Sequence, residues 1–273
     1  MNGLETRACL FAHPAKHSLS PAMHNAALEV LGIAARYQAR DVLPESLAAE
    51  FTGLRNSSLW GVNLSIPHKE AALGLVDSMS AEAGAMGAIN TVVNQNGKLH
   101  GLNTDAPGFM AALLEGGCNP PGFQVVVLGA GGAARGVCWA LQQAGANVSV
   151  WNRSPARARQ LCDEFGLNFV SDTDLETNVR NSSLLVNTTS VGLDNPLESP
   201  LPVGVLPNAG WVCDIVYKPL ETKLLKDARA AGLIGIDGLG MLVHQGALAL
   251  KAWTGRDAPV DVMREAALAQ LKP

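Results

Sequence analysis

A glycine-rich turn in the middle of the chain has the residue spacing of a dinucleotide-binding loop. Gly129-Ala130-Gly131-Gly132-Ala133-Ala134 fits the pattern G-x-G-x-x-G/A, with alanine in the last place. The first glycine of this pattern allows a tight turn, the second lets the backbone approach a pyrophosphate, and a small third residue lets the helix pack on the strand. An apolar run precedes the turn and a helix-like pattern follows it. The segment therefore predicts a dinucleotide site rather than a purely structural turn.

The residues after the next predicted strand indicate which dinucleotide binds. NAD sites place Asp or Glu about 20 residues further on, where the carboxylate binds the ribose 2′-hydroxyl. This chain has Asn152-Arg153-Ser154-Pro155-Ala156-Arg157 there, without a carboxylate. Two guanidinium groups suit a 2′-phosphate, and Ser154 as N-cap with Pro155 at the first helical position adds an anion-favouring helix end. The segment predicts NADP, against the alternative that both arginines are solvated surface charges.

A second Ser-Pro helix start could receive a small carboxylate. In Ser18-Leu19-Ser20-Pro21, Pro21 fits the first helical position and Ser20 fits the N-cap. Two hydroxyls and free backbone N–H groups would then converge at this helix end. An ordinary capped helix explains the same residues and is the simpler interpretation of this segment alone.

Lys69 follows a predicted strand whose polar residues could line a site. Asn63 and Ser65 are two residues apart and would share a face of that strand. Lys69 would lie just beyond the strand's carboxyl end, where ligands of open α/β sheets bind. Considered alone, Lys69 next to Glu70 is more simply a surface ion pair.

Two further polar segments flank a predicted hairpin. Asn90-Thr91 begins its first strand, and Asn103-Thr104-Asp105 follows its second strand and precedes a helix. Asp105 could act only as the N-cap of that helix. Asn90 could be no more than a polar residue at a strand edge.

Short apolar runs alternate with helix-period segments along the whole chain, which predicts an α/β fold whose second part is a doubly wound parallel sheet. Asn96-Gly97 is a hairpin turn signal and Pro120-Pro121-Gly122 is a linker signal. Helical segments are predicted to begin at Pro21, Pro44 and Pro67 and to cover residues 105–116, 241–253 and 262–271. The predicted strands are residues 8–12, 35–40, 61–64, 91–93, 99–102, 124–128, 147–151, 184–187, 211–215 and 234–236.

The composition limits the class of protein. The 273 residues are 48% hydrophobic and 16% charged, and the net charge of −4 argues against a nucleic-acid binder. Five cysteines without a Cys-x-x-Cys, no secretory signal and no apolar run of about 18 residues predict a cytoplasmic protein that is not in a membrane. His13 and His17 are four residues apart, but Pro14 breaks the helix that would align them, so we expect no metal site.

Nine segments in order resemble the shikimate dehydrogenase family, and together they cover nearly the whole chain. They are H-S-L-S-P (17–21), N-L-S-I-P-H-K-E (63–70), G-A-I-N-T (87–91), N-T-D-A-P-G-F (103–109), G-A-G-G-A-A (129–134), N-R-S (152–154), N-T-T-S (187–190), D-I-V-Y (214–217) and D-G-L-G-M-L-V-H-Q (237–245).

The resemblance implies a discontinuous α/β substrate domain, residues 1–104 and 239–273, and a Rossmann-type NADP-binding domain, residues 105–238, with a cleft between them. It implies reversible NADPH-dependent reduction of 3-dehydroshikimate to shikimate, for chorismate and aromatic amino-acid biosynthesis. The partner would be this small-molecule substrate, with no nucleic acid or membrane, and the enzyme would be a monomer or homodimer.

The resemblance also implies roles for individual residues. Lys69 matches the catalytic lysine, with Asp105 beside it, and Ser18 and Ser20 match serines that bind the substrate carboxylate. The other residues expected to line the substrate are Ser65, Asn90, Tyr217 and Gln245, and those expected near the cofactor, besides the glycine loop and residues 152–157, are Ile215, Gly238 and the loop 187–190.

The chemistry of the expected reaction suits a lysine. Hydride transfer to a carbonyl carbon leaves an alkoxide, and Lys69 could supply the proton in reduction and accept it in oxidation. Asp105 would orient the ammonium and the reacting hydroxyl. Burial would favour the neutral amine and Asp105 would favour the ammonium, so the sequence leaves this balance open.

The chain departs from the family pattern at two places, and other interpretations stay open. Ser65 stands where many members have Thr, and Ala12-His13-Pro14 replaces Gly-x-Pro; neither removes a group that the mechanism needs.

A quinate/shikimate dehydrogenase of broader specificity is the nearest alternative, although an NAD-dependent quinate enzyme would tend to have an acid after the second Rossmann strand. A methylenetetrahydrofolate dehydrogenase also pairs a Rossmann domain with a lysine-bearing catalytic domain, but the Ser18/Ser20 pair and the Asn103-Thr104-Asp105 block favour the shikimate dehydrogenase family. A non-catalytic ligand sensor on the same fold would be expected to lose Lys69 or Asp105.

Overall fold

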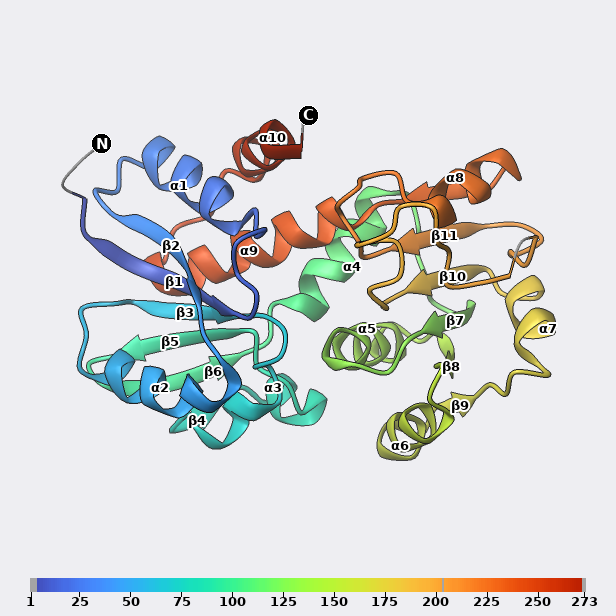
Figure 1. Ribbon diagram of the computed structural model, residues 1–273, viewed down its shortest axis with the longest axis horizontal. Coiled ribbons are helices and arrows are strands. Elements are labelled where there is room, and N and C mark those ends of the chain that lie inside the picture. Colours follow the sequence, from blue (N-terminus) through green and yellow to red (C-terminus); the bar gives the residue numbers. More distant parts are fainter. Residues whose placement is uncertain (1–3, 203, 272–273) are drawn as a thin grey trace. The chain divides into compact units, whose positions relative to one another are not determined.

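The computed structural model describes residues 4–202 and 204–271. Contacts divide the chain into two compact units, a first unit of Met1–Gly108 with Val243–Pro273 and a second unit of Phe109–Leu242. Each unit contains a six-stranded sheet with helices packed on it (Figure 1), which confirms the predicted α/β class. No helix within the described ranges is long and apolar enough to cross a membrane.

The sheet of the first unit is mixed, with the strand order β2-β1-β3-β5-β6-β4. β1 is parallel to β2 and β3, whereas β5 is antiparallel to β3 and β6. β5 and β6 form the predicted hairpin, and Asn96 and Gly97 have the positive φ angles, 54° and 88°, that its tight turn needs. The strands are β1 (Thr6–Ala12), β2 (Arg36–Asp41), β3 (Gly61–Leu64), β4 (Ser78–Met79), β5 (Thr91–Gln95) and β6 (Lys98–Leu102), and the helices are α1 (Ser20–Val30), α2 (Leu47–Arg55), α3 (Ala81–Met86) and α10 (Val260–Leu271), with parts of α4 (Asp105–Glu115) and α9 (Gly238–Thr254).

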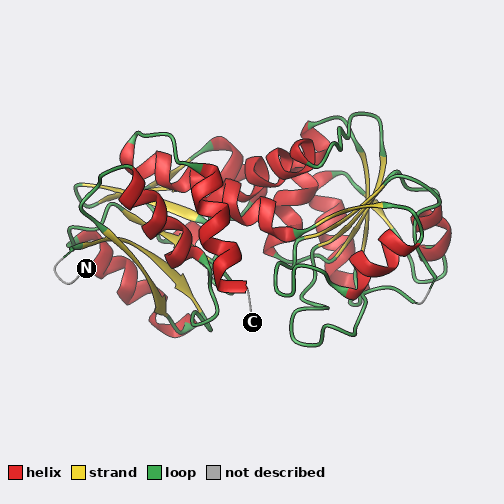
Figure 2. Cartoon of the chain, turned by 90° about the horizontal axis from the view of Figure 1, so that it is seen from above, coloured by secondary structure: helices red, strands yellow, loops and turns green. Residues whose placement is uncertain are grey.

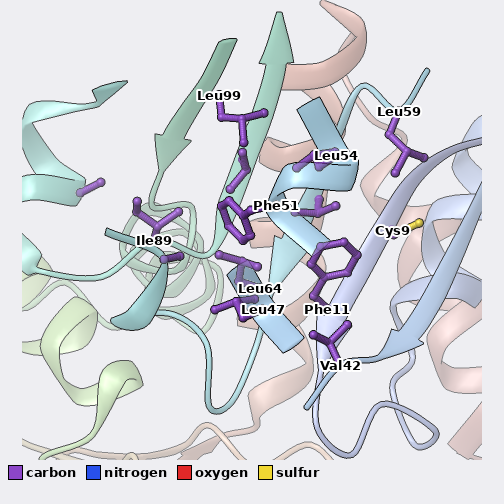
Figure 3. Close-up of a cluster of buried hydrophobic side chains, with 14 residues drawn as sticks. Cys9, Phe11, Val42, Leu47, Phe51, Leu54, Leu59, Leu64, Ile89 and Leu99 are labelled. Carbon is purple, nitrogen blue, oxygen red and sulfur yellow. The ribbon is translucent and has the colours of Figure 1, made fainter. Parts of the chain in front are cut away.

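The two faces of this sheet pack against different helices. On one face, Phe11 of β1 and its register partner Leu64 of β3 lie in one buried cluster with Phe51 and Leu54 of α2 (Figure 3). Burying each side chain of this size stabilises the fold by about 1.5–3 kcal/mol. Because side chains alternate along a strand, Asn63 points to the other face, where α1 lies against β2 and α10.

The sheet of the second unit is parallel throughout, with the order β12-β11-β10-β7-β8-β9. Helices lie on both sides of its twisted strands (Figure 2), which is the predicted doubly wound arrangement. The chain runs from β7 to β8 on one side and later places β10 on the other, so the carboxyl end of β7 is a topological switch point, where such sheets bind ligands. The elements are β7 (Gln124–Leu128), α5 (Gly132–Gln143), β8 (Asn147–Trp151), α6 (Pro155–Phe165), β9 (Asn168–Phe169), α7 (Leu175–Arg180), β10 (Leu184–Asn187), β11 (Trp211–Asp214), α8 (Lys223–Ala230) and β12 (Ile234–Ile236).

The helix predicted to begin at Pro67 is wrong. The backbone N–H of His68 donates to the carbonyl of Ser65 (2.8 Å), and residues 67–70 form turns followed by a 3₁₀ helix, Ala71–Gly74. The buried His68 ring donates a hydrogen bond from Nε2 to the carbonyl of Val42 (2.8 Å), and this bond holds the segment against the sheet. Pro44 likewise begins a 3₁₀ helix, Pro44–Ser46, before α2. The two-residue strands β4 and β9 were not predicted.

Candidate active site

Lys69 and Asp105 form an ion pair in the first unit. Lys69 Nζ lies 2.6 Å from Asp105 Oδ2, and the two side chains are 16% and 7% exposed. Lys69 follows β3 through a turn, and Asp105 is the first residue of α4. The partner of Lys69 is therefore a buried carboxylate from a distant segment and not its exposed neighbour Glu70. Such a pair can hold a proton at Nζ and fix its direction.

The carboxylate of Asp105 is available for this pair because the side chain of Asn103 caps α4 by accepting hydrogen bonds from its first backbone N–H groups. Asn103 Oδ1 accepts hydrogen bonds from the backbone N–H groups of Asp105 (3.0 Å) and Ala106 (3.3 Å). Its Nδ2 donates to the carbonyl of Ala88 (3.0 Å), so the Asn103 amide has one orientation. The alternative that Asp105 serves only as a helix cap is thus not what the structure shows.

Asn90 and Gln245 meet in a buried polar cluster of the same unit. Asn90, which is 1% exposed, accepts at Oδ1 from the backbone N–H of Thr104 (2.7 Å) and donates from Nδ2 to Thr104 Oγ1 (2.9 Å). Asn90 Nδ2 also lies 3.4 Å from Gln245 Oε1 on α9. A Cβ atom at Gly108 would lie 2.7 Å from the backbone nitrogen of Gln245, so glycine is what lets α4 approach α9 here.

The serines near α1 and β3 are only partly accessible. Ser18 is half-buried and Ser20 is buried, and neither hydrogen-bonds Lys69 or Asp105 in the described chain. α1 begins at Ser20, with Leu19 as N-cap, and Ser18 Oγ accepts from the backbone N–H of Ser20 (3.2 Å). The prediction of Ser20 as N-cap is therefore wrong by one residue. The N-cap is Leu19, and Ser20 is the first helical residue, whose backbone N–H donates to the Ser18 hydroxyl. Ser65 is half-buried and directly follows β3.

The glycine loop of the second unit has room for a pyrophosphate. Gly129 has φ of 113°, and a Cβ atom there would lie 2.5 Å from Thr188 Oγ1, so only glycine fits. Gly131 is the N-cap of α5, and a Cβ atom there would meet open space. The fully buried Ala134 lets α5 pack closely on the sheet. An open N-terminus of α5 at the switch point fits the diphosphate of a dinucleotide.

The segment after β8 presents two exposed guanidinium groups. α6 begins at Pro155 with Ser154 as N-cap, as predicted, although the Ser154 hydroxyl makes no capping bond. Asn152 Nδ2 donates to the carbonyl of Ser154 (3.0 Å). Arg153 and Arg157 are exposed and form no ion pair within the described residues. Two unpaired cations and no carboxylate fit a 2′-phosphate.

A buried carboxylate, Asp214, links two loops at the carboxyl edge of this sheet. Asp214 Oδ1 accepts from Asn187 Nδ2 (2.9 Å) and the Val216 backbone N–H (3.0 Å), and Oδ2 accepts from Thr222 Oγ1 (2.7 Å). Burial raises the pKa of Asp214 to about 6, against the lowering effect of these bonds. Asn187 Oδ1 in turn accepts from the backbone and hydroxyl of Thr189, which shapes the loop beside Gly129.

Two residues expected in the site, Ile215 and Tyr217, follow this carboxylate in the chain, and Gly238 packs against the carbonyl of Ile215. A Cβ atom at Gly238 would lie 2.2 Å from the carbonyl oxygen of Ile215, so glycine is required where α9 begins. Tyr217 is half-buried, and desolvation raises the pKa of its phenol. Tyr217 belongs to the second unit, whereas the other residues expected to bind substrate belong to the first.

Three residues of these clusters had no role in the sequence interpretation. Tyr37 of β2 donates from its hydroxyl to Asn63 Oδ1 (2.8 Å), Thr222 caps α8, and Asp214 holds the loops. Of the three, only Asp214 had a signal in the sequence, which is a single polar residue at the end of the apolar strand W-V-C-D. Their partners, 8 to 27 residues away, have no sequence signature.

Comparisons with known proteins cover both units. Residues 10–92 match the family model of the shikimate dehydrogenase substrate binding domain, residues 119–194 that of shikimate / quinate 5-dehydrogenase, and residues 238–268 that of the shikimate 5'-dehydrogenase C-terminal domain. Shikimate dehydrogenase (NADP(+)) of Thermus thermophilus is 49% identical over 96% of this chain and 97% of its own length. The enzyme of Symbiobacterium thermophilum is 46% identical over 96% and 94%.

Solved structures agree with these sequence matches. The crystal structure of shikimate 5-dehydrogenase from Thermus thermophilus in complex with NADP(H) and shikimate has a TM-score of 0.92 at 48% identity, covering 97% of this chain and 100% of that one. Quinate dehydrogenase from Corynebacterium glutamicum in complex with NAD is more distant in sequence, at 32% identity with a TM-score of 0.89 over 97% and 99%.

Proposed function

The chain belongs to the shikimate dehydrogenase family, and we propose that it catalyses the reversible NADPH-dependent reduction of 3-dehydroshikimate to shikimate. The observation that carries this proposal is the Lys69–Asp105 ion pair in the same unit as the Asn90–Gln245 cluster. A proton source beside buried amide groups is what reduction of a ketone on a hydroxylated ring requires. The reaction belongs to the shikimate pathway, which leads to chorismate and the aromatic amino acids.

We assign the proton transfer to Lys69. Bound NADPH supplies a hydride to the carbonyl carbon of the substrate. Lys69 donates a proton from Nζ to the carbonyl oxygen, which completes the hydroxyl group, and the amine then takes a proton from solvent. Asp105 holds Nζ through its carboxylate and stabilises the ammonium before transfer. In the oxidation of shikimate, Lys69 accepts the hydroxyl proton instead.

We assign substrate binding to the polar side chains that match the substrate-binding positions of the family. Ser18 and Ser20 bind the carboxylate through their hydroxyls, and Ser65, Asn90, Gln245 and Tyr217 bind the ring. The burial of Ser20, Asn90 and Gln245 supports this assignment, because buried polar groups discriminate strongly between ligands with and without matching hydroxyls.

We assign NADP to the glycine loop and to the segment after β8. The open space at Gly131 and the N-terminus of α5 suit the pyrophosphate. The unpaired guanidinium groups of Arg153 and Arg157 suit the 2′-phosphate, with Asn152 and Ser154 shaping the turn. We also assign Ile215 and Gly238 to the cofactor site, where the close approach of Gly238 to the carbonyl oxygen of Ile215 fixes the start of α9.

We place the enzyme in the cytoplasm as a monomer or homodimer. All five cysteines are buried thiols. Unpaired thiols suit a reducing compartment.

The direct test of this function is an assay that crosses two substrates with two nucleotides. Purified protein is incubated with shikimate or quinate, each with NADP⁺ or NAD⁺, and formation of reduced nicotinamide is followed by absorbance. We expect the highest kcat/KM for shikimate with NADP⁺. Fast oxidation of quinate with NAD⁺, with little oxidation of shikimate with NADP⁺, would overturn the proposal.

A further inference from the structure

The hydroxyl of Tyr37 begins a chain of buried hydrogen bonds in the first unit. Tyr37 is 1% exposed, and its hydroxyl donates to Asn63 Oδ1 (2.8 Å). The side chain of Ser20, on α1, also interacts with this phenol and acts to lower its pKa. The phenol of β2 is therefore hydrogen-bonded to β3 and lies near Ser20, at the expected carboxylate end of the site.

The direction of the hydrogen bond between Tyr37 and Asn63 follows from the partners of the amide. Asn63 Nδ2 lies 3.3 Å from the carbonyl oxygen of Asn90, which can only accept. The other atom of the amide, Oδ1, must therefore face Tyr37, and the phenol must donate to it. Burial raises the pKa of Tyr37 well above its ordinary value of 10, so the phenol keeps the proton it donates.

From Asn63 the hydrogen bonds continue to the substrate cluster. Asn63 Nδ2 donates to Thr91 Oγ1 (3.0 Å), and Thr91 Oγ1 donates to Asn90 Oδ1 (3.1 Å). The backbone N–H of Thr104 also donates to Asn90 Oδ1 (2.7 Å), which fixes that amide with Nδ2 towards Gln245. Each amide in the chain thus has one orientation, set by a main-chain group that cannot reverse its role.

We propose that Tyr37 is a positioning residue of the substrate site, whose hydroxyl anchors the Asn63–Thr91–Asn90 chain that orients Gln245. This inference rests on the proposed function, because it assumes that Ser20, Asn90 and Gln245 bind shikimate. Tyr37 itself is not expected to touch the substrate. It acts by holding donors and acceptors where the ligand hydroxyls and carboxylate meet them.

The surroundings of the ring allow the hydroxyl to be removed alone. Tyr37 stacks on His24, with ring centroids 4.2 Å apart and 13° between planes, and Trp253 lies 6.0 Å away. Burial lowers the pKa of His24 to about 3, so this ring is neutral, and neither of its nitrogens has a hydrogen-bond partner among the described residues. A phenylalanine at position 37 would keep these ring contacts.

The experiment compares Tyr37→Phe with the wild-type protein. We expect KM for shikimate to rise about five- to tenfold with kcat within about twofold, because binding groups lose their orientation while Lys69 is untouched. KM for NADP⁺ should stay unchanged, since the groups assigned to the nucleotide belong to the second unit. An unchanged KM for shikimate, or an equal rise in both KM values, would overturn the inference.

Variants at Thr91 give a second test that does not depend on Tyr37→Phe folding. Thr91→Val removes the hydroxyl and should raise KM for shikimate, whereas Thr91→Ser keeps it and should restore the wild-type value. A serine variant as impaired as the valine variant would contradict the hydrogen-bond chain. If wild-type protein fails to oxidise shikimate, the proposed function fails; if it does so and the variants keep its KM, only this inference fails.

Discussion

Each unit buries a carboxylate at the end of a strand or the start of a helix, but the two carboxylates have different kinds of partner. In the first unit Asp105 is paired with the ammonium of Lys69 at 2.6 Å. In the second unit Asp214 is fully buried and accepts three hydrogen bonds from neutral donors, and no lysine, arginine or histidine pairs with it in the part of the chain that the structure describes.

The difference suits the two carboxylates to different roles, the proposed proton transfer for Asp105 with Lys69 and the ordering of loops for Asp214. A carboxylate beside an ammonium stabilises the protonated form of a group that donates and recovers a proton, and fixes its direction. A carboxylate among neutral donors has no charged partner to exchange a proton with. Its two oxygens can accept more hydrogen bonds than the single oxygen of an amide side chain could. Asp214 ties the loop after β10 to the loop after β11, at the cost of a buried charge.

The largest expected effect comes from removing the charge of Asp105. Asp105→Asn keeps the size of the side chain but leaves the Lys69 ammonium without its counter-ion, so we expect kcat for shikimate oxidation to fall about a thousandfold. Steady-state kinetics measures this loss. Asp257→Asn is the matched control, since Asp257 pairs with Lys251 at 2.6 Å but is 87% exposed, and its kinetics should be unchanged. An equal fall in kcat for both variants would show that the buried ion pair matters no more for turnover than the surface ion pair.

The next effect is a pH-dependent stability that belongs to Asp214. Its pKa is raised from 3.8 to about 6 in the folded protein, mainly by burial. The protonated form is thus favoured in the fold, and the stability it contributes is present below pH 3.8 and is lost as pH rises through about 6. The loss is on the order of 3 kcal/mol. Asp214→Asn cannot ionise and lacks this loss.

Urea unfolding of the wild type and of Asp214→Asn between pH 4 and about 7 measures the difference directly. We expect the free energy of unfolding of the wild type to fall relative to the variant as the pH rises. A difference between the two proteins that does not change with pH would show that Asp214 is not a buried, cation-free carboxylate.

A smaller effect concerns the free cations of the second unit. Replacing Arg153 or Arg157 with alanine should raise KM for NADP⁺ about tenfold and leave KM for NAD⁺ within about twofold, because only NADP⁺ carries the 2′-phosphate. The matched control is Arg159→Ala on the same helix, since the Arg159 guanidinium lies 3.9 Å over the Phe169 ring. If Arg159→Ala changes the nucleotide preference as much as the other two, the assignment of the phosphate site is wrong.

The fold was largely predictable because its signals are local. The apolar runs at residues 61–64, 124–128, 147–151 and 184–187 coincide with β3, β7, β8 and β10. The errors lie where a tertiary contact overrides a local preference. Pro67 is compatible with a helix, but burial of the neighbouring His68 ring holds the segment in turns. β4 and β9, with two residues each, are too short for an alternating pattern.

The site was less predictable than the fold because its residues meet across long sequence distances. The residues expected from the family resemblance included Lys69 and Asp105, but the capping by Asn103 that frees Asp105 is visible only in the structure. Tyr37 lies in the strand R-Y-Q-A-R-D, where nothing local indicates that its hydroxyl contacts Asn63. Patterns predict which face a residue occupies, and only the fold shows what it meets there.

We assign to Lys69 the roles of proton donor and proton acceptor, and Lys69→Ala tests this assignment most directly. Turnover of shikimate with NADP⁺ and calorimetric binding of shikimate are measured on the same protein. We predict that kcat falls about a thousandfold while the Kd of shikimate changes less than about tenfold, because the variant lacks the proton acceptor but keeps the other binding groups. Near wild-type turnover together with normal shikimate binding would contradict the claim.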